Sequence, residues 1–257
     1  MNKKTQMSFI LISTFIALTN LSSSRLNPIF TYSTSTTPTM VGSVPITHTA
    51  KRLVYVPNYP VHFIGDSRTV GLEQALQYYH YDLSNQTFTA KIGQGYSWFS
   101  RQTELTQLPP SILILNLGVN DLGNEALYQE LYTAYADTCW KDSAIYIVSV
   151  NPCCSPCTSV SNQRIQAFNA SMQQWIDDYN AENASAETET LPIRYINTYD
   201  YLITNGFQSP DGLHYSADTY CRLYDYILSQ IQESIGDGSG TYVYETASPT
   251  DFVVPSI

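Results

Sequence analysis

The sequence predicts an α/β fold in which a parallel five-stranded sheet lies between layers of helices. Three observations predict it. Short apolar, β-branched runs alternate with longer segments of helical periodicity through the middle of the chain. Each run is bounded by turn-forming residues, as is typical of strands buried on both faces. Strands and helices that take turns along a chain form right-handed βαβ units, which make neighbouring strands parallel.

The expected elements follow one another in order. Strands are expected at 61–64, 88–92, 111–117, 144–150 and 193–196. Helices are expected at 70–79, 97–105, 125–135, 162–179 and 217–235. Ligands of such sheets bind beyond the carboxyl ends of the strands. Polar residues that directly follow a strand are therefore the candidates for a functional site.

Segments of different composition flank this unit, so that the chain divides into four parts. Residues 1–24 place Lys3 and Lys4 before an apolar run, which is the order of a signal peptide or, if uncleaved, an N-terminal anchor. The run is shorter than the roughly 20 residues that span a bilayer, so we expect a secreted or extracellular protein. Residues 25–52 form a Ser/Thr/Pro-rich spacer, residues 53–236 the folded domain and residues 237–257 a C-terminal tail.

Composition and charge exclude several classes of partner. Of the 257 residues 43% are hydrophobic, which is enough to build a core and excludes a wholly disordered chain. Twelve Lys and Arg against 22 Asp and Glu give a net charge of −10, which excludes nucleic acid and an anionic membrane surface as partners. Only 13% of the residues are charged, whereas 21 are Tyr, a profile that suits an uncharged partner such as carbohydrate.

Four polar clusters stand where the carboxyl edge of the sheet is expected. The first strand ends in Gly65-Asp66-Ser67-Arg68, the second is followed by Gly93-Gln94-Gly95, and the third runs into Gly118-Val119-Asn120-Asp121. Asp211-Gly212-Leu213-His214 stands just before the last helix. Because all four clusters belong to one edge, we expect them to form one site.

These residue types are the ones that acyl transfer to a hydroxyl requires. A serine hydroxyl such as Ser67 is a weak nucleophile until an imidazole such as His214 takes its proton. Asp211 can hold that imidazole in the useful tautomer. Backbone N–H groups of Ser67 and of a glycine, together with the side-chain amide of Asn120, can stabilise the developing oxyanion.

In this order the four clusters resemble the SGNH hydrolases, also called the GDSL esterase/lipase family, over residues 63–215. The resemblance implies a flavodoxin-like three-layer αβα sandwich that cleaves carboxylic esters with no metal and no cofactor. It implies that Ser67 is the nucleophile and an oxyanion-hole donor, that Gly95 and Asn120 are the other donors, and that Asp211 and His214 complete the triad.

Two positions depart from the family pattern. Arg68 stands where the name-giving leucine of the family stands, which affects the expected substrate preference. At this stage Arg68 is either a substrate-facing cation or the partner of a nearby carboxylate. The second cluster reads Gly-Gln-Gly, so Gly93 is a rival to Gly95 as an oxyanion donor.

Each cluster also has a purely structural explanation. Gly-Asp-Ser after a strand can be a turn in which Asp66 or Ser67 caps the next helix. Asn120 and the Asp211 cluster can likewise be ordinary turn residues. The joint occurrence of all four in the family order favours a site over four separate turns. A dinucleotide site is disfavoured because Trp98 replaces the third glycine of G-x-G-x-x-G.

Five cysteines accompany the expected export, namely Cys139, Cys153, Cys154, Cys157 and Cys221. Disulfides are common in exported chains, and an odd number leaves at least one thiol unpaired or intermolecular. We expect a disulfide within 153–157 to brace a loop over the substrate cleft. A single C-x-x-C, at Cys154 and Cys157, with no second ligand pair is weak evidence for a zinc site or a redox motif.

The sequence as a whole predicts a secreted serine esterase that hydrolyses short-chain acyl esters, such as acetyl esters, of a small molecule or a glycan. Two alternatives stay open: an O-acyltransferase with the same triad, and a non-catalytic carbohydrate-binding protein of the same fold. The sequence does not determine the oligomeric state, the acyl length or the disulfide pairing.

Overall fold

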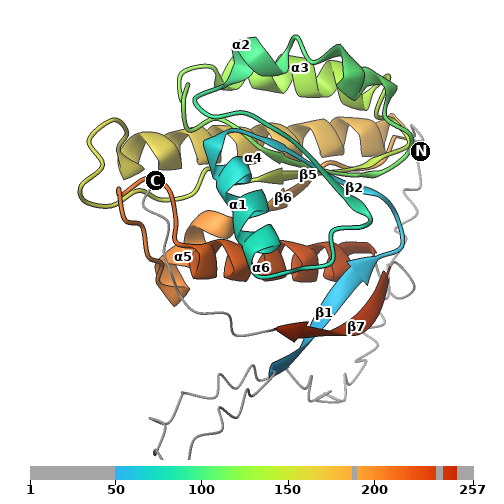
Figure 1. Cartoon of the computed structure of the whole chain (residues 1–257). Helices are drawn as coiled ribbons and strands as arrows, with labels where there is room; N and C mark the ends of the chain where they lie inside the picture. Colours follow the sequence, from blue (N-terminus) through green and yellow to red (C-terminus); the bar gives the residue numbers. More distant parts are fainter. Residues whose placement is uncertain (1–49, 187–189, 236–239, 248–257) are drawn as a thin grey trace, which may run out of the picture. The chain divides into compact units, whose positions relative to one another are not determined.

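Five parallel strands form the main sheet of the chain in a computed structural model that describes residues 50–186, 190–235 and 240–247 (Figure 1). The expected signal segment, nearly all of the spacer and most of the tail lie outside the described residues. The strands are β2 (Val61–Gly65), β3 (Gln86–Ala90), β4 (Ile112–Asn116), β5 (Ala144–Val148) and β6 (Arg194–Ile196).

The strand order is β3-β2-β4-β5-β6, and every neighbouring pair is parallel. This is the flavodoxin-like order, in which the first strand lies between the second and the third. The predicted fold class is confirmed. The connections leave β2 and β4 in opposite directions, so that a crevice is expected at their carboxyl ends.

Six α-helices pack against the two faces of this sheet. They are α1 (Ser67–Tyr78), α2 (Tyr96–Phe99), α3 (Glu125–Ala136), α4 (Asn162–Ser185), α5 (Thr198–Asn205) and α6 (Ala217–Ile235). In Figure 1, α1, α5 and α6 lie on one face of the sheet, and α2, α3 and α4 lie on the other. Side chains from each group of helices contribute to the core on their face.

Strand β4 shows why both faces are apolar. Its side chains alternate in direction, so Ile112 and Ile114 enter the core with α1 and α6, whereas Leu113 and Leu115 enter the core with α3 and α4. All four are essentially inaccessible to solvent. The unbroken apolar run of the sequence therefore reflects a strand buried on two sides.

The prediction of one helix at 97–105 is wrong. The structure has the short α2, then a 3₁₀ segment at Thr103–Gln107. The side-chain amide of Gln102 donates to the carbonyl of Trp98, which takes over an acceptor that a continuing helix would need. The carbonyl of Leu105 accepts a hydrogen bond from Trp140, since the residue four positions on, Pro109, has no N–H to donate.

Two strands at the ends of the described chain form a separate two-stranded sheet. β1 (Ala50–Pro57) pairs antiparallel with β7 (Gly240–Ala247). The C-terminal tail therefore contributes a strand, which pairs with β1 and not with a strand of the main sheet. Within the described ranges, no helix has the length and apolarity needed to cross a membrane.

Candidate active site

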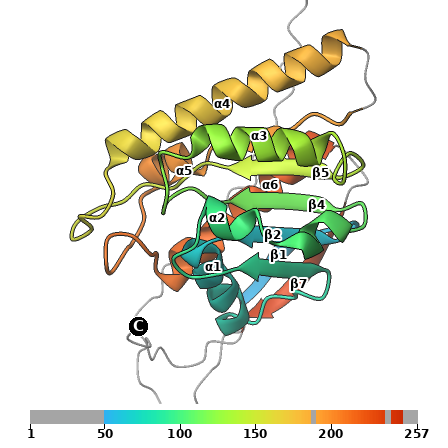
Figure 2. The ribbon, with the colours of Figure 1, turned by 90° about the horizontal axis from the view of Figure 1, so that it is seen from above.

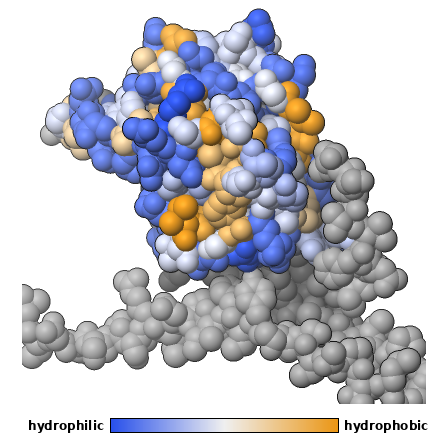
Figure 3. Space-filling model, turned by 90° about the vertical axis from the view of Figure 1, so that its left-hand side faces the viewer, coloured by the Kyte–Doolittle hydropathy of each residue, from blue (hydrophilic) through white to orange (hydrophobic). Residues whose placement is uncertain are grey.

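The polar clusters of the sequence lie on loops at the carboxyl edge of the sheet. The strands point the same way, and each of the first three clusters begins at or just after the end of its strand (Figure 2). The loop after β5 and the loop before α6 lie on the left of Figure 1. Figure 3 faces this side, where apolar patches lie between hydrophilic residues.

Ser67 is the first residue of α1, directly after the turn that ends β2. The Asp66 carboxylate caps the helix by accepting the N–H of Arg68 at 2.9 Å. Burial raises the pKa of the Asp66 carboxyl to about 6, although the N–H and the guanidinium of Arg68 act in the opposite direction. The cap fixes the helix start, and with it the position of the Ser67 hydroxyl.

The hydroxyl of Ser67 lies 2.8 Å from Nε2 of His214, and Nδ1 of the same ring lies 2.6 Å from a carboxylate oxygen of Asp211. Because the carboxylate can only accept, Nδ1 carries the proton and Nε2 is free to accept from Ser67. The structure thus brings together the three residues predicted as a triad, from positions 147 residues apart.

The turn that carries His214 is held by Asp211 itself. The second use of this carboxylate is to accept the backbone N–H groups of Leu213 and His214 at 2.8 and 2.7 Å. Burial acts to raise the pKa of Asp211, but the hydrogen bonds from the His214 side chain and from these two N–H groups lower it to about 2. Asp211 is therefore ionised throughout the neutral range.

The second and third clusters contact each other through Asp121. Its carboxylate accepts the backbone N–H of Tyr96 at 2.7 Å and the hydroxyl of Tyr128 at 2.9 Å. A Cβ on Gly95 would lie 2.3 Å from the same carboxylate, so a larger residue there would displace Asp121 from these hydrogen bonds. The side-chain amide of Asn120 donates to the carbonyl of Gln94 at 2.8 Å, which adds a second link between the two loops.

The backbone N–H groups of Ser67 and Gly95 have no acceptor among the described residues, and the same is true of the N–H of Gly93. Asn120 is exposed and has a second amide hydrogen beyond the one it donates to Gln94. Gly93 differs from Gly95, because it has a φ of +69° and nothing within 4 Å of a built Cβ. The contacts thus place Gly95, and not Gly93, against the loop of Asn120.

The main contacts of Arg68 differ from both roles expected from the sequence, although its charge does act on the neighbouring carboxyl of Asp66. Its side chain is 2% exposed and therefore does not face a substrate. It donates to three backbone carbonyl oxygens, those of Leu213, Asn151 and Pro152. Sequence reasoning missed this role, since no local signal shows which carbonyl groups a side chain will meet.

All five cysteines carry free thiols in the structure, so the disulfide expected within 153–157 is not formed there. The segment nevertheless packs against the turn of the histidine. The N–H of Cys154 donates to the carbonyl of Gly212 at 2.9 Å. The disulfide stays a prediction, which mass spectrometry of non-reduced peptides of the protein can test.

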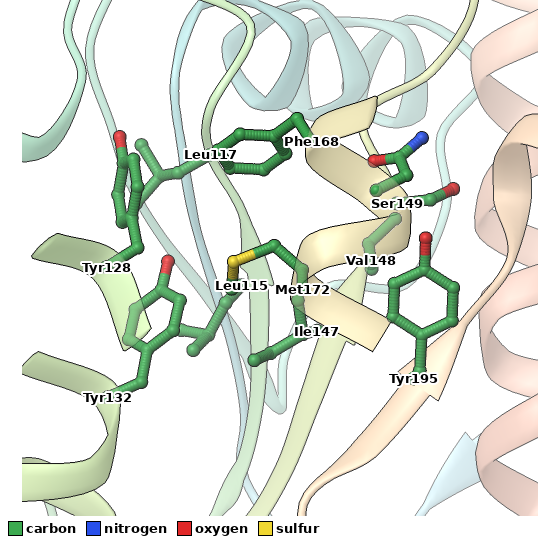
Figure 4. A pocket seen from close by; sticks show the side chains of 11 residues that line it. Leu115, Leu117, Tyr128, Tyr132, Ile147, Val148, Ser149, Phe168, Met172 and Tyr195 are labelled. Carbon is green, nitrogen blue, oxygen red and sulfur yellow. The ribbon is translucent and has the colours of Figure 1, made fainter. Parts of the chain in front are cut away.

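A small cavity lies inside the core and not at this site. It is bounded by β4, β5, α3 and α4, and Met172 points into it between Leu115 and Ile147 (Figure 4). None of the residues of the four clusters lines it. In the described part of the chain, no three His, Cys, Asp or Glu side chains come together as a possible metal-binding group.

A flavodoxin-like sheet with a serine, a histidine and a carboxylate in one hydrogen-bonded row at its carboxyl edge has the architecture of a serine hydrolase. Residues 47–227 match the sequence model of the GDSL-like Lipase/Acylhydrolase family, which covers more than half of the chain. The chain belongs to this family, and by class it is an SGNH-type carboxylic ester hydrolase. A comparison with curated proteins gives no match.

Several solved structures are similar to the chain to different degrees. A protein provisionally described as a platelet activating factor from Streptococcus pneumoniae has a TM-score of 0.54 and 19% identity, over 68% of this chain and 84% of that one. The catalytic domain of a peptidoglycan O-acetyltransferase from Streptococcus pneumoniae has a TM-score of 0.43 and 15% identity, over 75% of this chain and 99% of that one. A variant of an acetyl xylan esterase from Geobacillus stearothermophilus has a TM-score of 0.48 and 13% identity, over 68% of this chain and 95% of that one. At 19% identity, the first likeness supports the fold alone.

Proposed function

We propose that the chain is an exported serine esterase that removes short acyl groups, with Ser67, His214 and Asp211 as its catalytic triad. The observation that carries this proposal is the continuous row of hydrogen bonds from the Ser67 hydroxyl through the His214 ring to the Asp211 carboxylate, at 2.8 and 2.6 Å. Family membership supplies the reaction class, which is ester hydrolysis.

In the first half of the reaction Ser67 attacks the ester carbonyl while Nε2 of His214 takes its proton. Asp211 keeps the ring in the tautomer that accepts this proton and stabilises the imidazolium that results. The negative charge moves to the carbonyl oxygen of the substrate. The N–H groups of Ser67 and Gly95 and the amide of Asn120 are the donors we assign to it.

In the second half the tetrahedral intermediate collapses and His214 returns its proton to the leaving alkoxide, so that an alcohol departs and an acyl-enzyme stays on Ser67. Water then attacks the acyl carbonyl while Nε2 of His214 takes its proton. The bond between the acyl group and the Ser67 oxygen breaks, His214 returns the proton to that oxygen, and the carboxylic acid is released. An acyltransferase would use a sugar hydroxyl in place of this water.

The proposed substrate is a short acyl ester, such as an acetyl ester, on an extracellular polysaccharide or on peptidoglycan. Two features of the sequence support it. The segment at 1–24 has the order of an export signal, and the net charge of −10 disfavours polyanionic substrates. Release of free acetate from acetylated glycans with no acceptor present separates the candidates, because a binding protein releases none and a transferase little.

The triad is tested by Ser67→Ala in the full chain, with 4-nitrophenyl acetate as substrate. We expect kcat to fall by about 10⁴-fold or more, because the nucleophile is lost while the fold is kept. Ser84→Ala, an exposed serine away from the site, is the matched control and should keep full activity. Turnover by Ser67→Ala at the wild-type rate, with an unchanged circular dichroism spectrum, would refute the assignment.

A further inference from the structure

The guanidinium of Arg68 is a buried charge with an unusual set of partners. Its side chain is among the largest that are fully buried in the described chain. Nε donates to the carbonyl of Leu213 at 3.1 Å, one terminal nitrogen to Asn151 at 2.8 Å and the other to Pro152 at 3.3 Å. The group also lies 5.3 Å from the ring centre of Tyr215. Such a charge is tolerated inside a protein only when hydrogen bonds replace its water.

These partners connect the two sides of the catalytic site. Arg68 directly follows Ser67 in the sequence, whereas Leu213 and Tyr215 directly flank His214. The hydroxyl of Tyr215 also donates to the carbonyl of Pro152, which Arg68 contacts as well. The side chain of Arg68 therefore connects the start of α1 with the loop after β5 and with the segment that carries His214.

We infer that Arg68 is the positioning residue of the site, which holds His214 at hydrogen-bond distance from Ser67. This inference rests on the proposed function, since it concerns the same two side chains. The contact between His214 and Asp211 spans only three residues of one turn and can form without outside help. The contact between His214 and Ser67 joins segments 147 residues apart and needs such a tie.

The chemistry of arginine explains why this position departs from the leucine of the family pattern. A guanidinium presents five N–H donors in a rigid planar fork, so it can serve three carbonyl groups at once. A leucine would leave the carbonyls of Leu213, Asn151 and Pro152 without this donor. A lysine keeps the charge but loses the fork, which makes Arg68→Lys the informative variant.

The test compares Arg68→Lys with Arg222→Lys in the full chain. Arg222 on α6 also donates to a backbone carbonyl, that of Gly206, but its side chain is 21% exposed and in the described chain it has no contact with the triad, so it serves as the matched control. For Arg68→Lys we expect kcat to fall by about 100-fold, the effect of a displacement of about 1 Å between catalytic groups. KM should stay within about twofold, because Arg68 does not face the substrate. Arg222→Lys should keep both constants.

The value of kcat is calculated per folded molecule, and the assay temperature lies well below the midpoint of thermal unfolding. A second readout is the rate at which a sulfonyl fluoride modifies Ser67, which should fall in parallel with kcat. A loss of thermal stability in Arg68→Lys with kcat and modification rate unchanged would show a merely structural role and overturn the inference. If the wild type itself does not hydrolyse esters, the proposed function fails, and that outcome is distinct.

Arg68→Ala provides a second variant in case the lysine variant does not fold. Free guanidinium ion at millimolar concentration can occupy the vacated space and donate to the same carbonyl groups. We expect it to restore part of kcat, whereas methylammonium, which lacks the planar fork, restores none. Equal behaviour of the two ions, or no recovery with either, would contradict the positioning role.

Discussion

Asp66 combines a local benefit with an electrostatic cost. Its carboxylate caps α1, yet it is 1% exposed, and burial raises its pKa from 3.8 to about 6. The folded protein therefore binds a proton at Asp66 more tightly than the unfolded chain does. Between about pH 4 and pH 6 the free energy of unfolding should fall as the pH rises, because the folded state must lose this proton.

Asp66→Asn should remove this dependence. The amide oxygen can still cap the helix, and the side chain no longer ionises. We expect the variant to match the wild type near pH 3.5 and to be more stable at pH 7 by up to about 3 kcal/mol, the equivalent of the pKa shift. Urea unfolding at several pH values measures both quantities.

Asp82→Asn is the control of opposite sign. Asp82 also accepts the N–H of the residue two positions on, Ser84, at 2.9 Å, but it is exposed. Hydrogen bonds from Ser84 lower the pKa of Asp82, so its contribution is present above pH 4 and is lost as the pH falls. Parallel stability curves for the wild type and Asp66→Asn between pH 4 and 7 would contradict the assignment to Asp66.

The residues that meet at the site were largely predictable, whereas the residues that hold them were not. Ser67, Asp211 and His214 follow from motif order and from the rule that parallel strands share a carboxyl edge. Arg68 and Asp121 act through partners far along the chain, such as Leu213 and Tyr96. No local spacing encodes such partners, because they depend on how the loops pack.

At the scale of elements, α4 is notable for three asparagines that each bind the backbone of a neighbouring segment. Asn162 donates to and accepts from Cys153, Asn169 does so with Val150, and Asn180 with Ile193. All six distances lie between 2.8 and 3.0 Å. Each amide thus supplies the donor and the acceptor that a further strand would offer.

Asn169→Ala tests this role. The change would leave the buried N–H and C=O of Val150 without partners, at a cost of about 2–4 kcal/mol in the free energy of unfolding. Gln174→Ala on the exposed side of the same helix should change it by less than about 0.5 kcal/mol. Equal effects of the two changes in urea unfolding would show that the two hydrogen bonds between Asn169 and the backbone of Val150 contribute nothing to the free energy of unfolding.

The pairing of an asparagine side chain with a backbone segment also explains an error in the predicted strand boundaries. The apolar run predicts a strand over 144–150, but β5 ends at Val148. Val150 then pairs with the side chain of Asn169 in place of a strand. The eight-residue helix α5 was also missed, although Asn197 caps its start and Gly206 follows its end with a φ of +73°. Short elements carry too few apolar repeats for periodicity to reveal them.

At the scale of the whole molecule, one sheet separates two cores. The strand order puts β2 and β4 side by side, so the turn between β2 and Ser67 lies next to the loop of Asn120. This arrangement was predictable, because alternating strands and helices admit few topologies. The pairing of β1 with β7 was not predictable, since the two strands are separated by more than 180 residues and no local pattern relates them.

Because the two cores are separate, substitutions in one core should change the free energy of unfolding independently of substitutions in the other, although the domain unfolds as one cooperative unit. Ile176 on α4 and Ile227 on α6 are both buried, but they belong to the cores on opposite faces of the sheet. Ile176→Val and Ile227→Val should each cost about 0.5–1.5 kcal/mol through the lost methylene group. Because the two side chains share no partner cluster, the double variant should lose the sum to within about 0.5 kcal/mol.

Urea unfolding followed both by tyrosine and tryptophan fluorescence and by far-ultraviolet circular dichroism measures these costs. The two probes should give one coincident transition for all four proteins, because the strands contribute to both cores at once. Separate transitions would show that the layers unfold independently. A double-variant loss far from the sum would show that the sheet transmits strain from one core to the other.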